Sequence, residues 1–194
     1  MRNGLDHGTK PSSVGISIDQ NEAARFLQAL DPSVIHFTFQ VFDDNYDLRQ
    51  DRLAKKLHGT LQKCWNKLVD LSERGAGIFV TINETDLKGR EAENIVRVRA
   101  LFVDLDGASL DAILNDQEIP SPHIIIESSD GKFHVYWKVS NVPLKAFRAL
   151  QKFLRWFMRE ITGREDVRQR PAHFVTDTAA FGQMCFDEGA VLAA

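Results

Sequence analysis

The amino-acid sequence predicts an α+β fold, with a mixed or antiparallel sheet flanked by helices. Several short segments alternate apolar and polar residues, which is typical of half-buried strands. Other segments repeat apolar residues every three or four positions, which is typical of amphipathic helices. A turn-rich stretch at 128–132 separates two strand-like segments and indicates a hairpin, which requires antiparallel pairing.

The composition is that of an ordinary globular domain. The chain has 194 residues, of which 43% are hydrophobic and 26% are charged. It has no apolar run as long as a membrane span and no signal-peptide core, so we expect a cytoplasmic protein without a membrane partner. Cys64 and Cys185 form no metal-spaced set. The net charge of −3 gives no general attraction to nucleic acid, so any polyanion site must be local.

The first part of the chain predicts a leader, a helix and a strand. Residues 1–16 are polar and Gly-rich, and we expect them to be disordered. Ser17 or Asp19 is placed to cap a short helix, which Asp31 and the following proline end. The alternation at 34–42 predicts a half-buried strand.

The next part predicts a long helix and two further strands. Apolar residues recur every three or four positions over 52–73, which predicts one amphipathic helix, with an interruption at Gly59 left open. The apolar runs at 77–82 and 101–107 predict strands. We expect these two strands and the strand at 34–42 to be neighbours in one sheet.

The last part predicts a hairpin between two helices. A short helix is expected at 110–114, followed by strands at 123–127 and 133–139 that pair as a hairpin. Proline suits the first turn of a helix, so a final helix is expected from 143 to about 161, with Gly163 closing it.

The segment 101–107 (LFVDLDG) also carries two carboxylates, Asp104 and Asp106. Because side chains alternate along a strand, the two point the same way, with their attachment points roughly 6 to 7 Å apart. Carboxylates this close repel each other, and Mg²⁺ or Mn²⁺ with bound phosphates would offset that cost. The pair predicts a divalent-metal site, and a solvated acidic strand end fits the same two residues equally well.

The hairpin turn at 128–134 (SSDGKFH) gathers groups that suit a triphosphate. Gly131 permits close approach of the backbone, while Ser129, Lys132 and His134 supply donors to phosphate oxygens. Taken alone, the Asp-Gly pair indicates a hairpin turn, and a histidine on the polar face of a strand is usually a surface residue. The residues leave both interpretations open.

Two features near the end of the final helix extend the candidate site. Asp166 is the candidate third carboxylate that a two-metal phosphoryl-transfer site needs. The helix also carries basic residues in steps of three and four, which at about 100° per residue form a stripe suited to a nucleic-acid backbone or to solvent. This basic stripe consists of Lys145, Arg148, Lys152, Arg155 and Arg159. Opposite it lie the apolar positions Phe147, Leu150, Leu154, Phe157 and Ile161.

Four blocks, taken in order, resemble the RepB-like DNA primases of plasmids and phages, within the archaeo-eukaryotic primase superfamily. They are 37–44 (FTFQVFDD), 75–90 (GAGIFVTINETDLKGR), 98–107 (VRALFVDLDG) and 122–137 (PHIIIESSDGKFHVYW). The resemblance extends over about residues 22–166.

The resemblance implies an RRM-like primase core and a template-dependent nucleotidyltransferase that works on single-stranded DNA by two-metal phosphoryl transfer. Its partners would be nucleoside triphosphates, a single-stranded DNA template and a replicative helicase acting in trans, with Mg²⁺ or Mn²⁺ as cofactor. The implied catalytic metal ligands are Asp104, Asp106 and Asp166. The implied nucleotide-binding residues are Ser129, Lys132, His134 and Arg90, and Asn83 and Thr85 match a polar block near the site.

The resemblance also divides the chain. We expect the leader over 1–16, a primase-like catalytic domain over 17–166 and a divergent or truncated segment over 167–194. Family members continue after the third carboxylate with a segment like Pro-Ala-Arg, two further residues and Arg-Leu-Pro-Gly-Phe, whereas 171–181 here is PAHFVTDTAAF. A reading-frame disturbance, a truncation and true divergence each account for this difference.

Two other functions fit the sequence. The VDLDG run at 103–107 is similar to the nucleophile motif of haloacid-dehalogenase-type phosphatases, in which Asp104 would be phosphorylated and Asp106 would be the general acid. The other alternative is a primase-like module that binds single-stranded DNA without catalysis. The basic stripe supports such binding as well as it supports synthesis.

Overall fold

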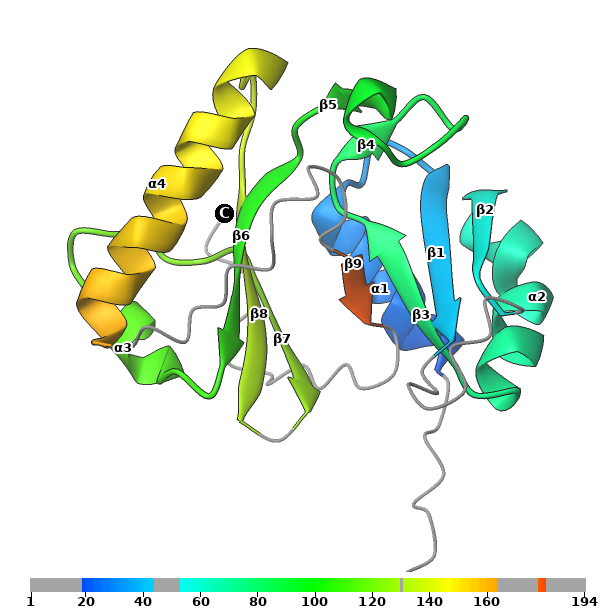
Figure 1. Ribbon diagram of the computed structural model, residues 1–194, viewed down its shortest axis with the longest axis horizontal. Coiled ribbons are helices and arrows are strands. Elements are labelled where there is room, and N and C mark those ends of the chain that lie inside the picture. The colour runs from blue at the N-terminus through cyan, green and yellow to red at the C-terminus, as the bar shows by residue number, and fades with distance from the viewer. Residues whose placement is uncertain (1–18, 44–52, 130, 164–177, 181–194) are drawn as a thin grey trace, which may run out of the picture.

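A computed structural model describes residues 19–43, 53–129, 131–163 and 178–180. This part of the chain mixes helices and strands, which confirms the α+β class with antiparallel sheets flanked by helices (Figure 1). In chain order the elements are α1 (Gln20–Leu30), β1 (Phe37–Asp43), β2 (Lys55–Gly59), α2 (Leu61–Glu73), β3 (Ala76–Thr81), β4 (Glu84–Thr85), η1 (Ala92–Asn94), β5 (Ile95–Arg97), β6 (Ala100–Asp106), α3 (Leu110–Leu114), β7 (Ile124–Ser129), β8 (Lys132–Lys138), α4 (Leu144–Thr162) and β9 (Thr178–Ala180).

Antiparallel strands form three sheets in the described residues. The first sheet has the order β2-β1-β3-β9, the second pairs β4 with β5, and the third has the order β6-β8-β7. The first and third sheets lie beside each other, and α1 packs against apolar residues of both (Figure 1).

The expected placement of the strand at 101–107 beside the other two is wrong. β1 pairs with β3 as expected, but β6 pairs with β8, from Ala100 opposite Lys138 to Asp106 opposite Lys132. The β4–β5 pair separates β3 from β6 along the chain, and β9 takes the free edge of β3. The strand with the two carboxylates therefore belongs to a sheet of its own.

The single helix expected over 52–73 is also wrong, because its first part is a strand. β2 pairs with β1, with Leu57 opposite Phe39, and α2 begins only at Leu61. The change occurs at Gly59, whose φ of +150° favours glycine. Thr60 then caps the helix, its hydroxyl accepting a hydrogen bond from Lys63 N at 3.2 Å.

β1 begins at Phe37 and is buried on both faces, so the prediction of a half-buried strand is wrong. Phe39 is fully buried in the main core, and on the opposite face Thr38 and Gln40 are buried as well. The Thr38 hydroxyl lies 2.5 Å from Thr85 Oγ1 and 2.9 Å from His58 Nδ1. Hydrogen bonds within the protein thus allow this polar face to be covered.

The other predicted elements are confirmed. Asp19 caps α1 by accepting a hydrogen bond from Asn21 N at 2.7 Å, and the helix ends at Asp31. The hairpin of β7 and β8 and the short helix α3 form where expected. α4 follows Pro143 and ends at Gly163, whose φ is +62°.

The third sheet lies between two hydrophobic clusters. On one face, Val103 and Leu105 of β6 join residues of β8, α3 and α4 in one cluster. On the other face, Phe102 of β6 and Tyr136 of β8 join α1 and the first sheet in the larger cluster. Alternate side chains of the same two strands therefore tie the two layers together.

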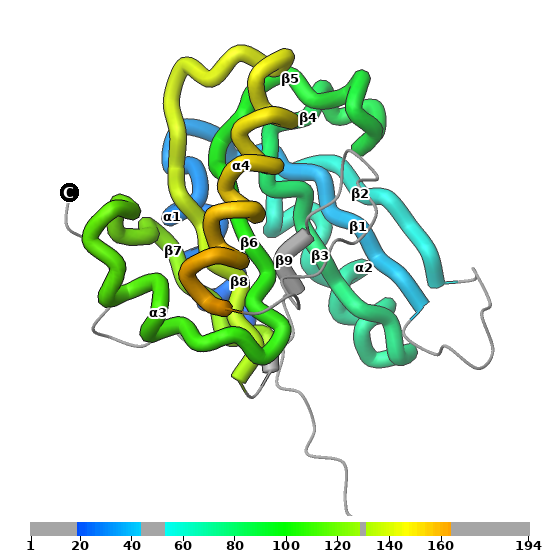
Figure 2. Tube along the Cα trace, turned by 60° about the vertical axis from the view of Figure 1, so that its left-hand side comes forward, coloured from blue at the N-terminus to red at the C-terminus, as the bar shows by residue number. Residues whose placement is uncertain are grey.

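α4 lies across the strands of the third sheet (Figure 2). β6 is an edge strand, and Gln151 of α4 pairs with its exposed backbone. The Gln151 side-chain amide donates to Phe102 O and its oxygen accepts from Phe102 N, the latter at 3.3 Å. No helix of the described residues is long and apolar enough to cross a membrane.

Candidate functional site

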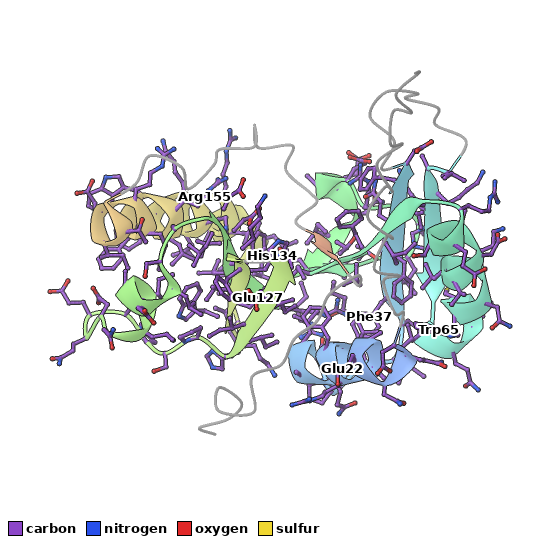
Figure 3. All side chains as sticks on the ribbon, turned by 90° about the horizontal axis from the view of Figure 1, so that it is seen from below. Glu22, Phe37, Trp65, Glu127, His134 and Arg155 are labelled. Carbon is purple, nitrogen blue, oxygen red and sulfur yellow. The ribbon has the colours of Figure 1, made fainter. Side chains whose placement is uncertain are left out.

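The two carboxylates lie on one face of β6, at the end away from β5. Val103 and Leu105 point into the cluster beneath α3 and α4, so Asp104 and Asp106 point to the opposite side. In the register of the sheet, Asp104 lies opposite His134 and Asp106 opposite Lys132 of β8. Figure 3 shows His134 near the middle of the molecule.

Each carboxylate has a partner from the opposite strand. Lys132 Nζ lies 2.9 Å from Asp106 Oδ1, and His134 Nε2 lies 3.6 Å from Asp104 Oδ1. On its other side, His134 Nδ1 lies 3.4 Å from the hydroxyl of Tyr136, which is buried. The lysine ammonium offsets part of the repulsion between the two carboxylates. We call these four residues, Asp104, Asp106, Lys132 and His134, the polar cluster.

The turn of the hairpin is held by its own hydrogen bonds. Gly131 has a φ of +66°, and its N–H donates to Glu127 Oε1 at 3.1 Å. The Ser128 hydroxyl donates to Lys132 O at 3.3 Å. Ser129 is the last residue of β7, and its side chain lies outside the described residues.

The polar cluster offers donors that suit Mg²⁺ or Mn²⁺. The Asp104 side chain is 50% exposed and that of Asp106 is 23% exposed, so both carboxylates are open to solvent. Mg²⁺ usually keeps several waters and uses one or two carboxylates together with substrate phosphates, which fits this pair. Over residues 19–43, 53–129, 131–163 and 178–180, no three acidic, histidine or cysteine side chains converge as a complete metal group. Asp166, the predicted third ligand, lies outside the described residues.

Arg90 lies against the first sheet. Its guanidinium stacks over the Phe42 ring, 5.4 Å from the centroid, and its Nε lies 4.0 Å from Glu91 Oε1. Burial lowers the pKa of Arg90, and Glu91 acts in the opposite direction. Two buried nitrogens, Nε and Nη1, have no hydrogen-bond partner in the described protein. The contacts found for Arg90 therefore place it beside Phe42 rather than in the polar cluster.

The polar block of Asn83 and Thr85 supports the backbone. Asn83 Oδ1 accepts hydrogen bonds from the amides of Arg99 at 2.9 Å and Ala100 at 3.4 Å, where β6 begins. Thr85 Oγ1 accepts from Leu87 N at 3.2 Å and contacts the Thr38 hydroxyl. In this structure both residues fix the course of the chain.

A buried charge network at the start of β6 was not predicted. Asp31 accepts hydrogen bonds from Arg99 Nε at 2.8 Å and from Arg97, which also pairs with Glu84. Burial acts to raise the pKa of Asp31, but hydrogen bonds from Ser33, Arg99 and Arg97 outweigh it and hold the pKa well below its ordinary value. Burial lowers the pKa of Arg99, and Asp31 opposes that change.

The basic stripe runs along α4, with Lys145, Arg148 and Lys152 exposed and Arg155 and Arg159 partly buried. Beside it is an apolar surface that the sequence reasoning missed. Phe153 is 60% exposed and Trp156 is 54% exposed, while the core side of the helix is formed around Gln151 and Met158. The angular positions of Phe153 and Trp156 on a helical wheel, away from the core positions, were the available signal.

A cleft of about 330 Å³ opens elsewhere, between residues 33–36 before β1 and Glu84, Thr85 and Leu87. None of these lining residues belongs to β6, β7 or β8. The cleft is therefore separate from the polar cluster, which lies on the exposed surface of β6 and β8.

Comparisons with known proteins give one similar fold. No family model matches this sequence, and no curated protein matches it. A solved structure with a similar fold is the catalytic domain of primase RepB′ in complex with initiator DNA, at 15% identity and a TM-score of 0.49. The similarity covers 74% of this chain and 66% of that chain, so the chain spans about two thirds of the length of that domain.

Proposed function

We propose that this protein is a DNA primase, a template-dependent nucleotidyltransferase of plasmid or phage replication. In this proposal it joins nucleoside triphosphates on single-stranded DNA with Mg²⁺ or Mn²⁺, and a replicative helicase acts in trans. The observation that carries the proposal is the polar cluster, in which two carboxylates of β6 face a lysine and a histidine of β8. The motif order noted in the sequence supports the same function.

The two carboxylates are the proposed metal ligands, and Asp166 is the proposed third. Asp104 and Asp106 present oxygens on one face of a rigid strand, which is the placement that a hydrated Mg²⁺ with bound phosphates requires. Bound there, Mg²⁺ or Mn²⁺ supplies Lewis acidity toward the attacking 3′ hydroxyl and the departing pyrophosphate.

Lys132 and His134 are the proposed triphosphate-binding residues, together with Ser129 and Arg90. The Lys132 ammonium is 51% exposed and pairs with Asp106, so it can exchange that partner for a phosphate oxygen. The His134 ring lies between Asp104 and the Tyr136 hydroxyl, which fixes its orientation. These two side chains would hold a triphosphate against the carboxylates.

The test is metal-dependent dinucleotide synthesis on single-stranded DNA, with labelled nucleoside triphosphates. Asp104→Asn combined with Asp106→Asn keeps the side-chain shape and removes both charges. We expect product formation to fall by at least about 100-fold, because electrostatic stabilisation of the transferred group is lost. Binding of Mn²⁺, followed by calorimetry, is expected to weaken in parallel.

Asp70→Asn is the matched control, because Asp70 is an exposed carboxylate on α2 with ion pairs of its own. It is expected to leave synthesis unchanged. Circular dichroism confirms that each variant is folded. Equal product from the wild type and the double variant would exclude the proposed catalytic role of Asp104 and Asp106.

A DNA-binding module without catalysis is the second candidate function. It is favoured by the Lys132–Asp106 ion pair, because a protein cation already satisfies one of the two carboxylates. Single-stranded DNA binding that weakens steeply with salt, in a protein that makes no dinucleotide with either metal, would select this function.

A further inference from the structure

We infer that α4 presents a base-stacking surface for single-stranded nucleic acid, formed by Phe153 and Trp156 beside the basic stripe. This inference rests on the proposed interaction with single-stranded DNA and adds a recognition mode to it. The polar cluster plays no part in the argument.

The two aromatic side chains lie on a surface of α4 that nothing in the described structure covers. Phe153 is 60% exposed and Trp156 is 54% exposed, and Leu150 beside them is 38% exposed. Burying a large aromatic side chain is strongly favourable, so rings left in water on a stable helix mark an interaction surface when they are grouped.

The rings are also held in position. Phe153 lies 5.9 Å from the Trp156 ring and 6.2 Å from the Phe157 ring, measured between centroids. Phe157 itself packs against the cluster beneath α4. The pair is therefore supported from below and presents ring faces and edges outward with few side-chain torsions left to restrict on binding.

Charge identifies the partner as an anion. On the helix surface, Trp156 is one turn from Lys152 at i−4 and from Arg159 at i+3. The helix contains five basic residues and one acidic residue, Glu160, in a chain whose net charge is −3. A protein partner would bury the apolar surface equally well, but it would have to match this local excess of positive charge.

Single-stranded nucleic acid supplies both required features. Its phosphates match the basic stripe, and its unpaired bases offer flat apolar faces to aromatic side chains. A helix with a basic stripe and an adjacent aromatic pair is thus suited to phosphates along one side and bases along the other. Figure 3 shows the labelled Arg155 of this stripe on α4.

The experiment measures binding of a fluorescent oligo-dT by anisotropy, using the whole chain. Phe153→Ala combined with Trp156→Ala is expected to weaken binding by about tenfold or more, with an unchanged dependence on salt. Lys152→Ala combined with Arg159→Ala is expected to lower the slope of log affinity against log salt by about 1. On a strand of the same length without bases, the aromatic double variant and the wild type are expected to bind equally.

Leu114→Ala is the control, since Leu114 is an exposed apolar residue of α3, 49% exposed. It is expected to leave binding unchanged. Unchanged oligo-dT affinity in the aromatic double variant would overturn the inference, even if dinucleotide synthesis proceeds. A concentration-dependent dimer of the wild type, abolished by the same variant in sedimentation, would overturn it in favour of a protein interface.

Discussion

Asp31 links α1 to the start of β6 through charge. Its carboxylate accepts hydrogen bonds from two arginines and from the Ser33 hydroxyl, the last at 2.6 Å. Asp31 is 5% exposed and Arg99 is 4% exposed. A buried pair of this kind is costly to break from one side, because the remaining charge has neither water nor a counter-ion.

We therefore predict that Asp31→Asn destabilises the fold by about 3 kcal/mol at neutral pH. The folded-state pKa of Asp31 is lowered, so its stabilisation is present above the unfolded pKa of about 4 and is lost as pH falls through the folded pKa. The free energy of unfolding, from urea titrations over an acid pH series, should fall less steeply below pH of about 4 in the variant than in the wild type. Asp70→Asn, at an exposed ion pair, is the control, and an equal effect of both would contradict the prediction.

At this scale, the sequence indicated residues whose signal is local. Asp104 and Asp106 are two positions apart on a recognisable strand, so their common face followed from the period of a strand. The pairing of Asp31 with Arg99 was not predictable, because it joins residues 68 positions apart. Likewise, Lys132 was assigned to phosphate from its turn, whereas its contact with Asp106 depends on the register between β6 and β8.

Among the elements, the junction between β2 and α2 depends on one backbone conformation. At Gly59 the φ of +150° is one that other residues rarely adopt. An added Cβ would lie 3.5 Å from Cys64 Sγ and from Lys63 Cδ, which is ordinary contact. Space therefore does not require glycine here, and the dihedral angle does.

We predict that Gly59→Ala lowers the free energy of unfolding by about 1 to 3 kcal/mol through backbone strain alone. Chemical denaturation followed by circular dichroism measures the change. Lys55→Ala, at an exposed position of the same strand, is the control for the loss of β propensity. A Gly59→Ala protein as stable as that control would show that the strand end relaxes without cost.

The same junction explains why β2 escaped prediction. Leu53, Leu57 and Leu61 are spaced by four, which satisfies a helix as well as it satisfies separate elements. The pairing of β2 with β1 decides between them, and that contact is not visible in a local window. β9 is shorter still and has no alternation, whereas α4 and the β7–β8 hairpin were predictable because proline, glycine and long periodic runs mark their ends.

For the whole molecule, the third sheet is shared by two clusters. Ile126 of β7 is 1% exposed in the larger cluster, and Leu105 of β6 is fully buried in the smaller one. Because β6 and β8 contribute alternate side chains to both clusters, neither cluster can lose its packing while the sheet stays intact. The described part of the chain should unfold as one cooperative unit.

We predict that Ile126→Ala and Leu105→Ala each lower the free energy of unfolding by about 3 kcal/mol, since each leaves a cavity. In both variants, urea transitions followed by tryptophan fluorescence and by far-ultraviolet circular dichroism should coincide. Leu114→Ala, at an exposed position, should change neither transition. Separated transitions in the Leu105→Ala protein would mean that the cluster beneath α4 unfolds independently.

Gln151 has a consequence for how substrate and template would be held relative to each other. Its amide contacts both backbone groups of Phe102, two residues before Asp104, and it projects from the helix that carries the aromatic pair and the basic stripe. A two-point amide contact tolerates little sliding or rotation. A strand bound along the outer side of α4 would therefore be registered to the carboxylates by a fixed offset, as a ruler is registered to its zero mark.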